Sequence, residues 1–297
     1  MLYNIDFSVA SLAVLALCLM HFYSHPTRKE EPTSAMFLII TWLALADVAF
    51  DVITSFTISY AASLPLFFLN LTSVVFYLLQ LAMPLVLFCY VLALCNAFTF
   101  PPPPRFWALA VLPVLMALVT LSSPITHLVF WFDETTFAFN HGFMFPGLYV
   151  SCFFFVAATL VYAFLHADYL RPVDMGAVIV YVALSILAPA IQIAYPTLVL
   201  TSFAVGLCVM FLYLSLADPR GSVDTDTHLY NASSLKRQIT AMRKANLPYS
   251  LACFSLDHLQ PFNPRALAES DKSATLDFAA KIRQTARSPL VYFFGKE

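Results

Sequence analysis

Residues 198–231 read LVLTSFAVGLCVMFLYLSLADPRGSVDTDTHLYN, and this stretch joins two parts of the chain that differ in character. Its apolar half ends at residues 218–221 (DPRG), because Pro and Gly both disfavour a continuing helix. Only four of the 15 Lys and Arg residues precede residue 217, and the other eleven follow it. The sequence therefore predicts two domains, a membrane block at residues 1–217 and a polar, cytoplasmic module at residues 218–297.

The composition excludes a water-soluble globular fold. Hydrophobic residues make up 61% of the 297 residues, charged residues make up 11%, and the mean hydropathy is +0.80. A soluble domain has about 25% charged residues. No basic run indicates a nucleic-acid partner, and the six cysteines lack the C-x-x-C spacing of a metal site. We expect the lipid bilayer as the main partner, no metal and no resident cofactor.

Seven apolar stretches are long enough for transmembrane helices, since crossing about 30 Å of hydrocarbon takes about 20 helical residues. None alternates as a β-barrel strand would, and helices satisfy their own backbone in lipid. The predicted fold class is an α-helical membrane bundle of seven helices followed by a partial α/β domain. The predicted spans are residues 5–23, 34–59, 66–97, 106–122, 146–167, 174–194 and 197–216.

The few basic residues of the membrane block indicate its orientation. Arg28 and Lys29 follow the first span. Arg105 follows the third span and Arg171 the fifth, whereas the connections after the second, fourth and sixth spans contain no Lys or Arg. Because basic loops stay on the cytoplasmic side, we predict that the N-terminus lies outside the cell and the C-terminus in the cytoplasm.

Two acidic residues fall inside the second predicted span. Asp47 and Asp51 lie four residues apart and therefore project from the same face of a helix. Buried carboxylates in membranes often mark ion, proton or amine sites, and they can equally serve as partners in interhelical hydrogen bonds. Both readings stay open, and the polar residues that we expect near the pair are Asn70, Gln80, His21 and Gln192.

The longest outer connection, residues 122–146, is rich in aromatic residues. Phe at alternating positions on both sides of the polar turn DETT predicts a short hairpin at the membrane interface. This segment is either a lid over a ligand pocket or an aromatic belt at the lipid headgroups. Its candidate sensor residues are Trp131, Asp133 and Glu134.

The polar module reads as alternating helices and strands. The pattern predicts a capped amphipathic helix from about Ser233 to Ala245, a buried strand at 249–256, a helix at 266–287 and a strand at 290–294. Such an order implies a sheet with helical crossovers.

Three segments of this module resemble the GGDEF family, the diguanylate cyclase fold. Residues 224–231 (DTDTHLYN) resemble its D-x-L-T-G-L-x-N-R entry motif, and residues 254–263 (FSLDHLQPFN) resemble its D-I-D-H-F-K-x-x-N segment. Residues 292–297 (YFFGKE) fall where the GGDEF signature would be. The seven-span block looks like the membrane sensors found before bacterial GGDEF domains. The resemblance implies a bacterial inner-membrane sensor with a truncated module.

The residues that carry catalysis in that family are replaced here. Ser255 stands at the family's metal-binding Asp, and Gln260 stands at its phosphate-contacting Lys. Lys296 places a cation where Mg²⁺ would need a carboxylate. Asn263, at the position that contacts guanine in the family, is retained as a nucleotide-binding candidate.

Three functional hypotheses follow from these patterns. The first is a sensor without cyclase activity, whose partners are an unknown extracellular ligand and a second copy or another GGDEF protein. An alternative is an active diguanylate cyclase that uses Mg²⁺ to make cyclic di-GMP from GTP. A third hypothesis is an ion or small-molecule transporter built on Asp47 and Asp51.

Overall fold

The computed structural model describes residues 5–24, 32–95, 104–133, 135–195, 198–217, 229–244, 249–252, 277–278, 280–281 and 292. The chain divides into two compact units, Met1–Leu216 and Ala217–Glu297.

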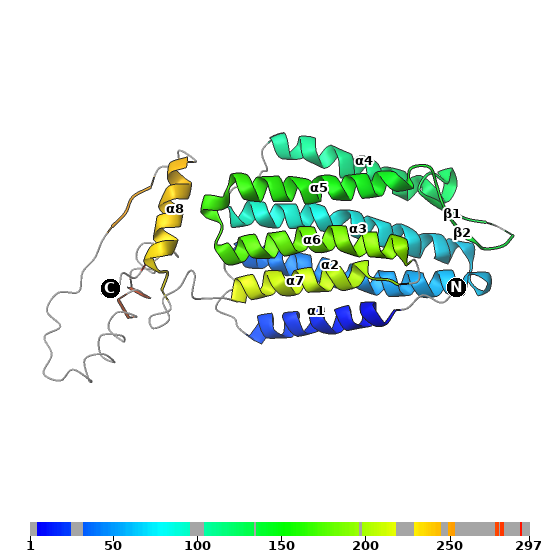
Figure 1. Cartoon of the computed structure of the whole chain (residues 1–297), viewed down its shortest axis with the longest axis horizontal. Coiled ribbons are helices and arrows are strands. Elements are labelled where there is room, and N and C mark those ends of the chain that lie inside the picture. The colour runs from blue at the N-terminus through cyan, green and yellow to red at the C-terminus, as the bar shows by residue number, and fades with distance from the viewer. Residues whose placement is uncertain are drawn as a thin grey trace, which may run out of the picture. The chain divides into compact units, whose positions relative to one another are not determined.

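The described part of the first unit is a bundle of helices that run side by side, with a small hairpin at one end (Figure 1). A helix occupies each of the seven predicted spans. Short 3₁₀ turns at Ala61–Ser63 and Ala167–Tyr169 join neighbouring helices. The helices are α1 Asp6–Ser24, α2 Pro32–Ser59, α3 Leu66–Leu94, α4 Pro104–Thr126, α5 Phe145–Leu165, α6 Pro172–Ala194 and α7 Thr201–Ala217.

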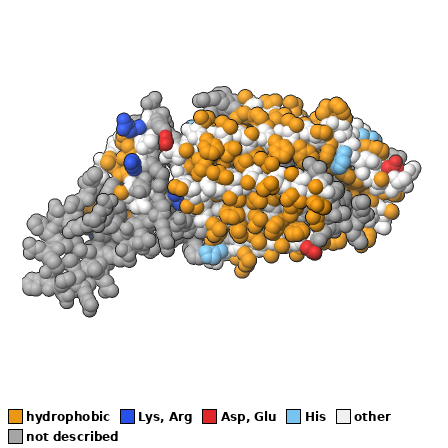
Figure 2. Space-filling view, viewed as in Figure 1, with side chains coloured by type: hydrophobic (Ala, Val, Ile, Leu, Met, Phe, Trp, Pro, Cys, Tyr) orange, Lys and Arg blue, Asp and Glu red, His pale blue; other side chains and the backbone are white. Residues whose placement is uncertain are grey.

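Six of these helices, α1 to α6, are long and apolar enough to cross a membrane. The seventh, α7, has 17 residues, at the lower limit of about 17–25 for a spanning helix. Figure 2 shows hydrophobic side chains covering the visible face of the bundle. Phe67, Ile125 and Leu165 are 75%, 88% and 74% exposed. Lipid accommodates such a surface, and the unit is the helical bundle of a multi-pass membrane protein.

The bundle contains two clusters of buried apolar residues. The larger cluster joins α1, α2, α3, α5, α6 and α7 through side chains such as Leu15, Phe37, Tyr90 and Val209. The smaller cluster lies where α3, α4 and α5 meet the hairpin. The two clusters fix the helices around a pocket that is described below.

The predicted hairpin is present. Strands β1 (Phe130–Phe132) and β2 (Phe139–His141) pair antiparallel, with Trp131 opposite Asn140. Gly142 follows the hairpin at a point where a Cβ atom would lie 2.2 Å from the carbonyl oxygen of Leu128. Only glycine fits such a close approach, and the Gly142 N–H donates a 2.8 Å hydrogen bond to the Val129 carbonyl oxygen in the segment that follows α4.

In the second unit, the predicted amphipathic helix is α8 (Ala232–Lys244). Asn231 caps it, because the Asn231 Oδ1 atom accepts a 2.9 Å hydrogen bond from the Ser234 backbone N–H. Tyr230, just before the cap, forms an isolated parallel bridge with Tyr292. The α/β domain expected from the resemblance falls mostly outside the described residues.

One expectation in this unit is wrong over the residues that can be compared. Residues 249–252 were expected to begin a buried strand, but they form no strand and all four are exposed. Tyr249 and Leu251 are 44% and 54% exposed. Apolar β-formers make a buried strand only when a neighbouring strand and a packing surface are available, and these four residues have neither among the described part of the chain.

Candidate functional site

Two carboxylates are buried on one face of α2. Asp47 and Asp51 are 3% and 6% exposed, and they lie one helical turn apart, as their spacing predicted. A buried carboxylate is costly unless its oxygen atoms find donors. The two residues differ in whether their carboxylate oxygens have hydrogen-bond donors, and this difference defines the candidate site.

Asp51 belongs to a polar junction between α1, α2 and α7. Its Oδ2 atom accepts a 3.1 Å hydrogen bond from the Ser8 hydroxyl of α1 and a second hydrogen bond from the Ser202 hydroxyl of α7. The Ser11 hydroxyl donates to the Ser202 carbonyl oxygen at 2.8 Å. The structure thus favours the structural reading for Asp51, namely an interhelical hydrogen-bond partner.

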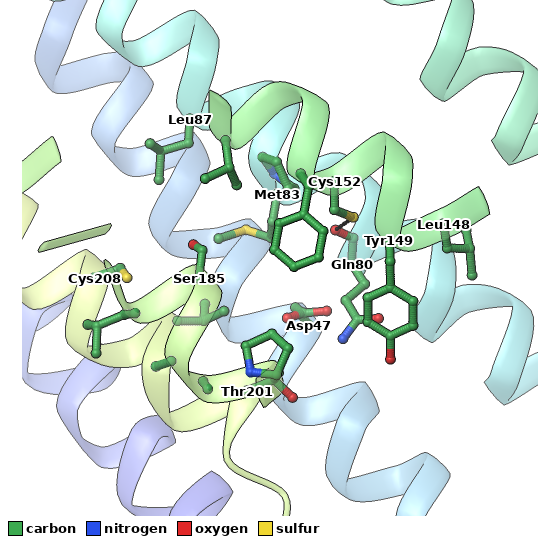
Figure 3. Close-up of a pocket in the computed structure, with 18 of the residues that line it drawn as sticks. Asp47, Gln80, Met83, Leu87, Leu148, Tyr149, Cys152, Ser185, Thr201 and Cys208 are labelled. Atoms are coloured by element: carbon green, nitrogen blue, oxygen red, sulfur yellow. Dashed lines mark hydrogen bonds between the residues drawn. The ribbon is translucent and has the colours of Figure 1, made fainter. Parts of the chain in front are cut away.

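Asp47 instead faces a cavity of about 120 Å³ inside the bundle. Its Oδ1 atom is buried and has no hydrogen-bond partner among the described residues. Figure 3 shows the carboxylate in the middle of the pocket, with Gln80 and Tyr149 to one side and Ser185 and Cys208 to the other. Asp47 is therefore the acidic group that remains available to a ligand.

The pocket lies between five helices and is mainly apolar. Asp47 comes from α2, and the other lining residues come from α3, α5, α6 and α7. They are Tyr77, Gln80, Met83, Pro84, Leu87, Phe145, Leu148, Tyr149, Cys152, Phe153, Val156, Tyr181, Leu184, Ser185, Ala188, Pro189, Thr201, Ala204, Val205 and Cys208.

The polar neighbours that the sequence proposed for the acidic pair divide into two groups. Gln80 lines the pocket. Gln192 is not a lining residue, but it accepts a 2.9 Å hydrogen bond from the hydroxyl of Thr201, which is one. His21 contacts the Tyr213 hydroxyl away from the pocket, and Asn70 is not among the lining residues.

The hairpin packs on the wall of this pocket. The rings of Phe130 and Tyr77 have centroids 5.5 Å apart, and those of His141 and Phe145 stack at 3.9 Å. Tyr77 and Phe145 both line the pocket. Contact with Phe145 removes solvent from one side of the imidazole and lowers the pKa of His141 from its ordinary value. The hairpin therefore contacts two residues of the pocket wall, and both readings of this segment, a lid and an aromatic belt, stay open.

The candidate sensor residues of the hairpin serve its local structure. The Asp133 Oδ1 atom accepts hydrogen bonds from the Thr135 hydroxyl at 2.6 Å and from the backbone N–H groups of Thr135 and Thr136, each at 2.8 Å. These bonds lower the pKa of Asp133 to about 2. The Trp131 ring stacks on His127 at 5.7 Å. Neither residue lines the pocket, and Glu134 lies outside the described residues.

A second polar group joins the start of α6 to the end of α7. Arg171 forms an ion pair with Asp174, with Nη2 and Oδ1 2.7 Å apart. Arg171 also donates to the Ser215 carbonyl oxygen at 2.8 Å, and the Ser215 hydroxyl donates to Asp174. Asp174 is 4% exposed. In the sequence Arg171 indicated only the orientation of the chain, although Pro172 and Asp174, directly after it, are typical of the first turn of a helix.

Several pocket residues were missed at the level of the sequence. Tyr149, Cys152 and Ser185 look like ordinary members of apolar spans, and no local pattern separates them from lipid-facing neighbours. Only the packing of five helices brings them near Asp47.

The remaining predicted positions cannot be placed. Ser255, Gln260, Asn263 and Lys296, the positions of the nucleotide-related interpretation, lie outside the described residues. Within the described residues, no three His, Cys, Asp or Glu side chains lie close enough together to hold a metal ion. Comparison with protein-family models, with curated proteins and with solved structures found no match to this chain.

Proposed function

We propose that the chain is a membrane signalling protein that senses a small ligand in the pocket around Asp47. The observation that carries this proposal is a buried carboxylate oxygen without a partner, facing a cavity inside a bundle of apolar helices. Within a membrane segment, such a group marks a functional site more often than a structural one. The neighbouring Asp51 shows that this bundle can satisfy a carboxylate where it serves structure.

Helix α7 is the route from the pocket to the polar module. It contributes Thr201, Ala204, Val205 and Cys208 to the pocket wall. Its first turn is tied to Asp51 through Ser202, and its last turn is tied to α6 through Ser215. The chain then continues directly from α7 into residues 218–297. Any ligand that moves α7 must therefore rearrange one or both of these polar ties.

The proposed arrangement has seven membrane spans, with the N-terminus outside and the C-terminus in the cytoplasm of a bacterial cell. Basic residues after the first, third and fifth spans support this orientation. The pocket includes Phe145 at the start of α5 and Thr201 at the start of α7, so it extends toward the hairpin end of the bundle. In this orientation that end faces outside, and the ligand arrives from there.

The polar module acts as a GGDEF-like output that lacks cyclase activity. Its motif resemblance supports a role in binding a second copy or a partner GGDEF protein, and Ser255, Gln260 and Lys296 argue against synthesis of cyclic di-GMP. Robust conversion of GTP to cyclic di-GMP by the purified full chain with Mg²⁺ would refute this part of the proposal.

The coupling between pocket and module is tested by filling the pocket. In Ala204→Phe, a buried pocket residue on α7 becomes a ring that occupies the cavity. We expect changed amide hydrogen exchange at residues 211–217 and in α8. The matched control is Leu214→Phe, at a position on α7 that is 50% exposed, and it should leave exchange in α8 as in the wild type. Unchanged exchange in both segments of Ala204→Phe would contradict the coupling.

A further inference from the structure

Among the described residues, no positively charged side chain lines the pocket around Asp47. Asp47 is the acidic residue among the lining residues, and none of those residues is Lys or Arg within the described part of the chain. Its nearest acidic neighbour, Asp51, is turned to Ser8 and Ser202. A buried carboxylate is stabilised by an opposite charge at hydrogen-bond distance, so a positively charged ligand would provide the partner that the Asp47 oxygen lacks.

The rest of the pocket lining is mainly apolar, and it therefore favours a ligand whose charged group is attached to an apolar body. Aromatic rings of Tyr77, Phe145, Tyr149 and Phe153 surround the cavity together with aliphatic side chains of α6 and α7. Such rings attract a cation over their faces and pack against hydrocarbon. A bare metal ion lacks the several oxygen ligands that it needs, because the lining offers few polar atoms. An anion would be repelled by the Asp47 carboxylate.

The volume limits the size of the ligand. The cavity measures about 120 Å³, somewhat less than the engineered apolar cavity of about 150 Å³ that binds benzene. One ring or a short branched chain fits this space, with a single polar group beside Asp47. Gln80 and Ser185 line the same pocket as the carboxylate (Figure 3), and their oxygen atoms can accept the remaining protons of an ammonium group.

We infer that the pocket binds a small organic cation with an apolar body, a primary or secondary amine, with Asp47 as its counter-ion. This inference rests on the proposed function, in which the same pocket is the ligand site. It adds the chemical class of the ligand and the residue that selects it.

The test measures binding of three probes of one size and different charge to the full chain in lipid nanodiscs. Benzylamine is protonated near pH 7, as the Lys amine is, benzyl alcohol is neutral, and benzoate is an anion. Isothermal titration, with empty nanodiscs as the blank, gives each dissociation constant. We expect benzylamine to bind at least about tenfold more tightly than benzyl alcohol, and benzoate not to bind.

Asp47→Asn removes the charge while keeping the size of the side chain. Benzylamine should then bind at least about tenfold more weakly, whereas the affinity for benzyl alcohol should stay within about twofold. Retained binding of benzyl alcohol also shows that the variant pocket is folded. The control Asp6→Asn removes an exposed acid at the start of α1, outside the pocket, and should bind all three probes as the wild type does.

Each other outcome overturns the inference. Equal affinity of the wild type for benzylamine and benzyl alcohol would mean that the pocket binds apolar molecules without a charge preference, and the proposed function would stand. Unchanged benzylamine binding in Asp47→Asn would place the amine elsewhere. Failure of all three probes would exclude this ligand class, and the hydrogen-exchange experiment on Ala204→Phe would still decide separately whether the pocket is coupled to α8.

Discussion

The polar junction around Asp51 and the pocket around Asp47 lie one helical turn apart on α2, and they handle the same chemical group in opposite ways. At the junction, hydroxyl groups from α1 and α7 donate to the Asp51 carboxylate, and the helices pack closely. At the pocket, the helices separate and one oxygen of Asp47 is left without a donor. A buried acid in this bundle therefore stabilises the fold only where neighbouring helices supply hydrogen-bond donors to its oxygen atoms.

The largest effect is expected from removing the satisfied carboxylate. Asp51→Ala leaves the hydroxyls of Ser8 and Ser202 without their acceptor and opens a small cavity. We expect a loss of about 2–3 kcal/mol in the free energy of unfolding, measured by SDS titration followed by far-UV circular dichroism. Asp51→Asn keeps an oxygen acceptor and should lose less than about 1.5 kcal/mol. An equal loss in Asp47→Ala would remove the distinction between the two sites.

The close packing at the junction can be broken without touching a carboxylate. A Cβ atom at Gly206 of α7 would lie 2.2 Å from the Ser11 Oγ atom of α1, so Gly206→Ala must turn the Ser11 hydroxyl away from the Ser202 carbonyl oxygen or push the two helices apart. We expect a loss of about 1–2 kcal/mol in the free energy of unfolding. In the matched control Gly176→Ala, a Cβ atom meets nothing within 4 Å, and stability should stay level or rise by about 0.5 kcal/mol. Equal effects of the two substitutions would show that α1 and α7 are not in close contact.

At the pocket, removal of the carboxylate is expected to raise the free energy of unfolding instead of lowering it. Asp47→Leu replaces a carboxylate that lacks a donor with an apolar side chain of similar size. The unligated protein should therefore become more stable, by about 1 kcal/mol, in the same SDS titration. The variant should also lose its response to benzylamine. A loss of stability comparable to that of Asp51→Ala would indicate that Asp47 has a partner that holds the fold together.

The smallest effect concerns Asp133, a satisfied carboxylate outside the helices. Its pKa is lowered to about 2 in the folded turn, below the unfolded value of about 3.9. Its contribution to hairpin stability is thus present above the unfolded pKa and is lost as the pH falls toward the folded pKa. Fluorescence of Trp131, in a background with Trp42→Phe and Trp107→Phe, should change over this window between about pH 5 and pH 2.

Asp133→Ala provides the control for that titration. Without the carboxylate, the transition between about pH 5 and pH 2 should disappear. Its persistence would assign the change to another group.

The membrane block was largely predictable from the sequence because lipid imposes simple rules. Long apolar runs had to become helices, and a helix lies at each of the seven predicted positions. The alternating Phe residues around a polar turn predicted the hairpin for the same local reason. The prediction of a strand beginning at residues 249–252 was wrong over these described residues, because strand formation depends on a partner strand that no local pattern supplies.

The sequence by itself determined the helices of the membrane block and that Asp47 and Asp51 share one face of α2. Helical periodicity and the cost of exposing backbone groups to lipid are local properties of the chain. Only the tertiary structure decided which of the two acids is satisfied. That choice depends on Ser8 and Ser202, which lie 43 and 151 residues away from Asp51, and on five helices meeting around Asp47. Hydrogen bonding and cavity formation act between distant segments, so they emerge only when the helices pack.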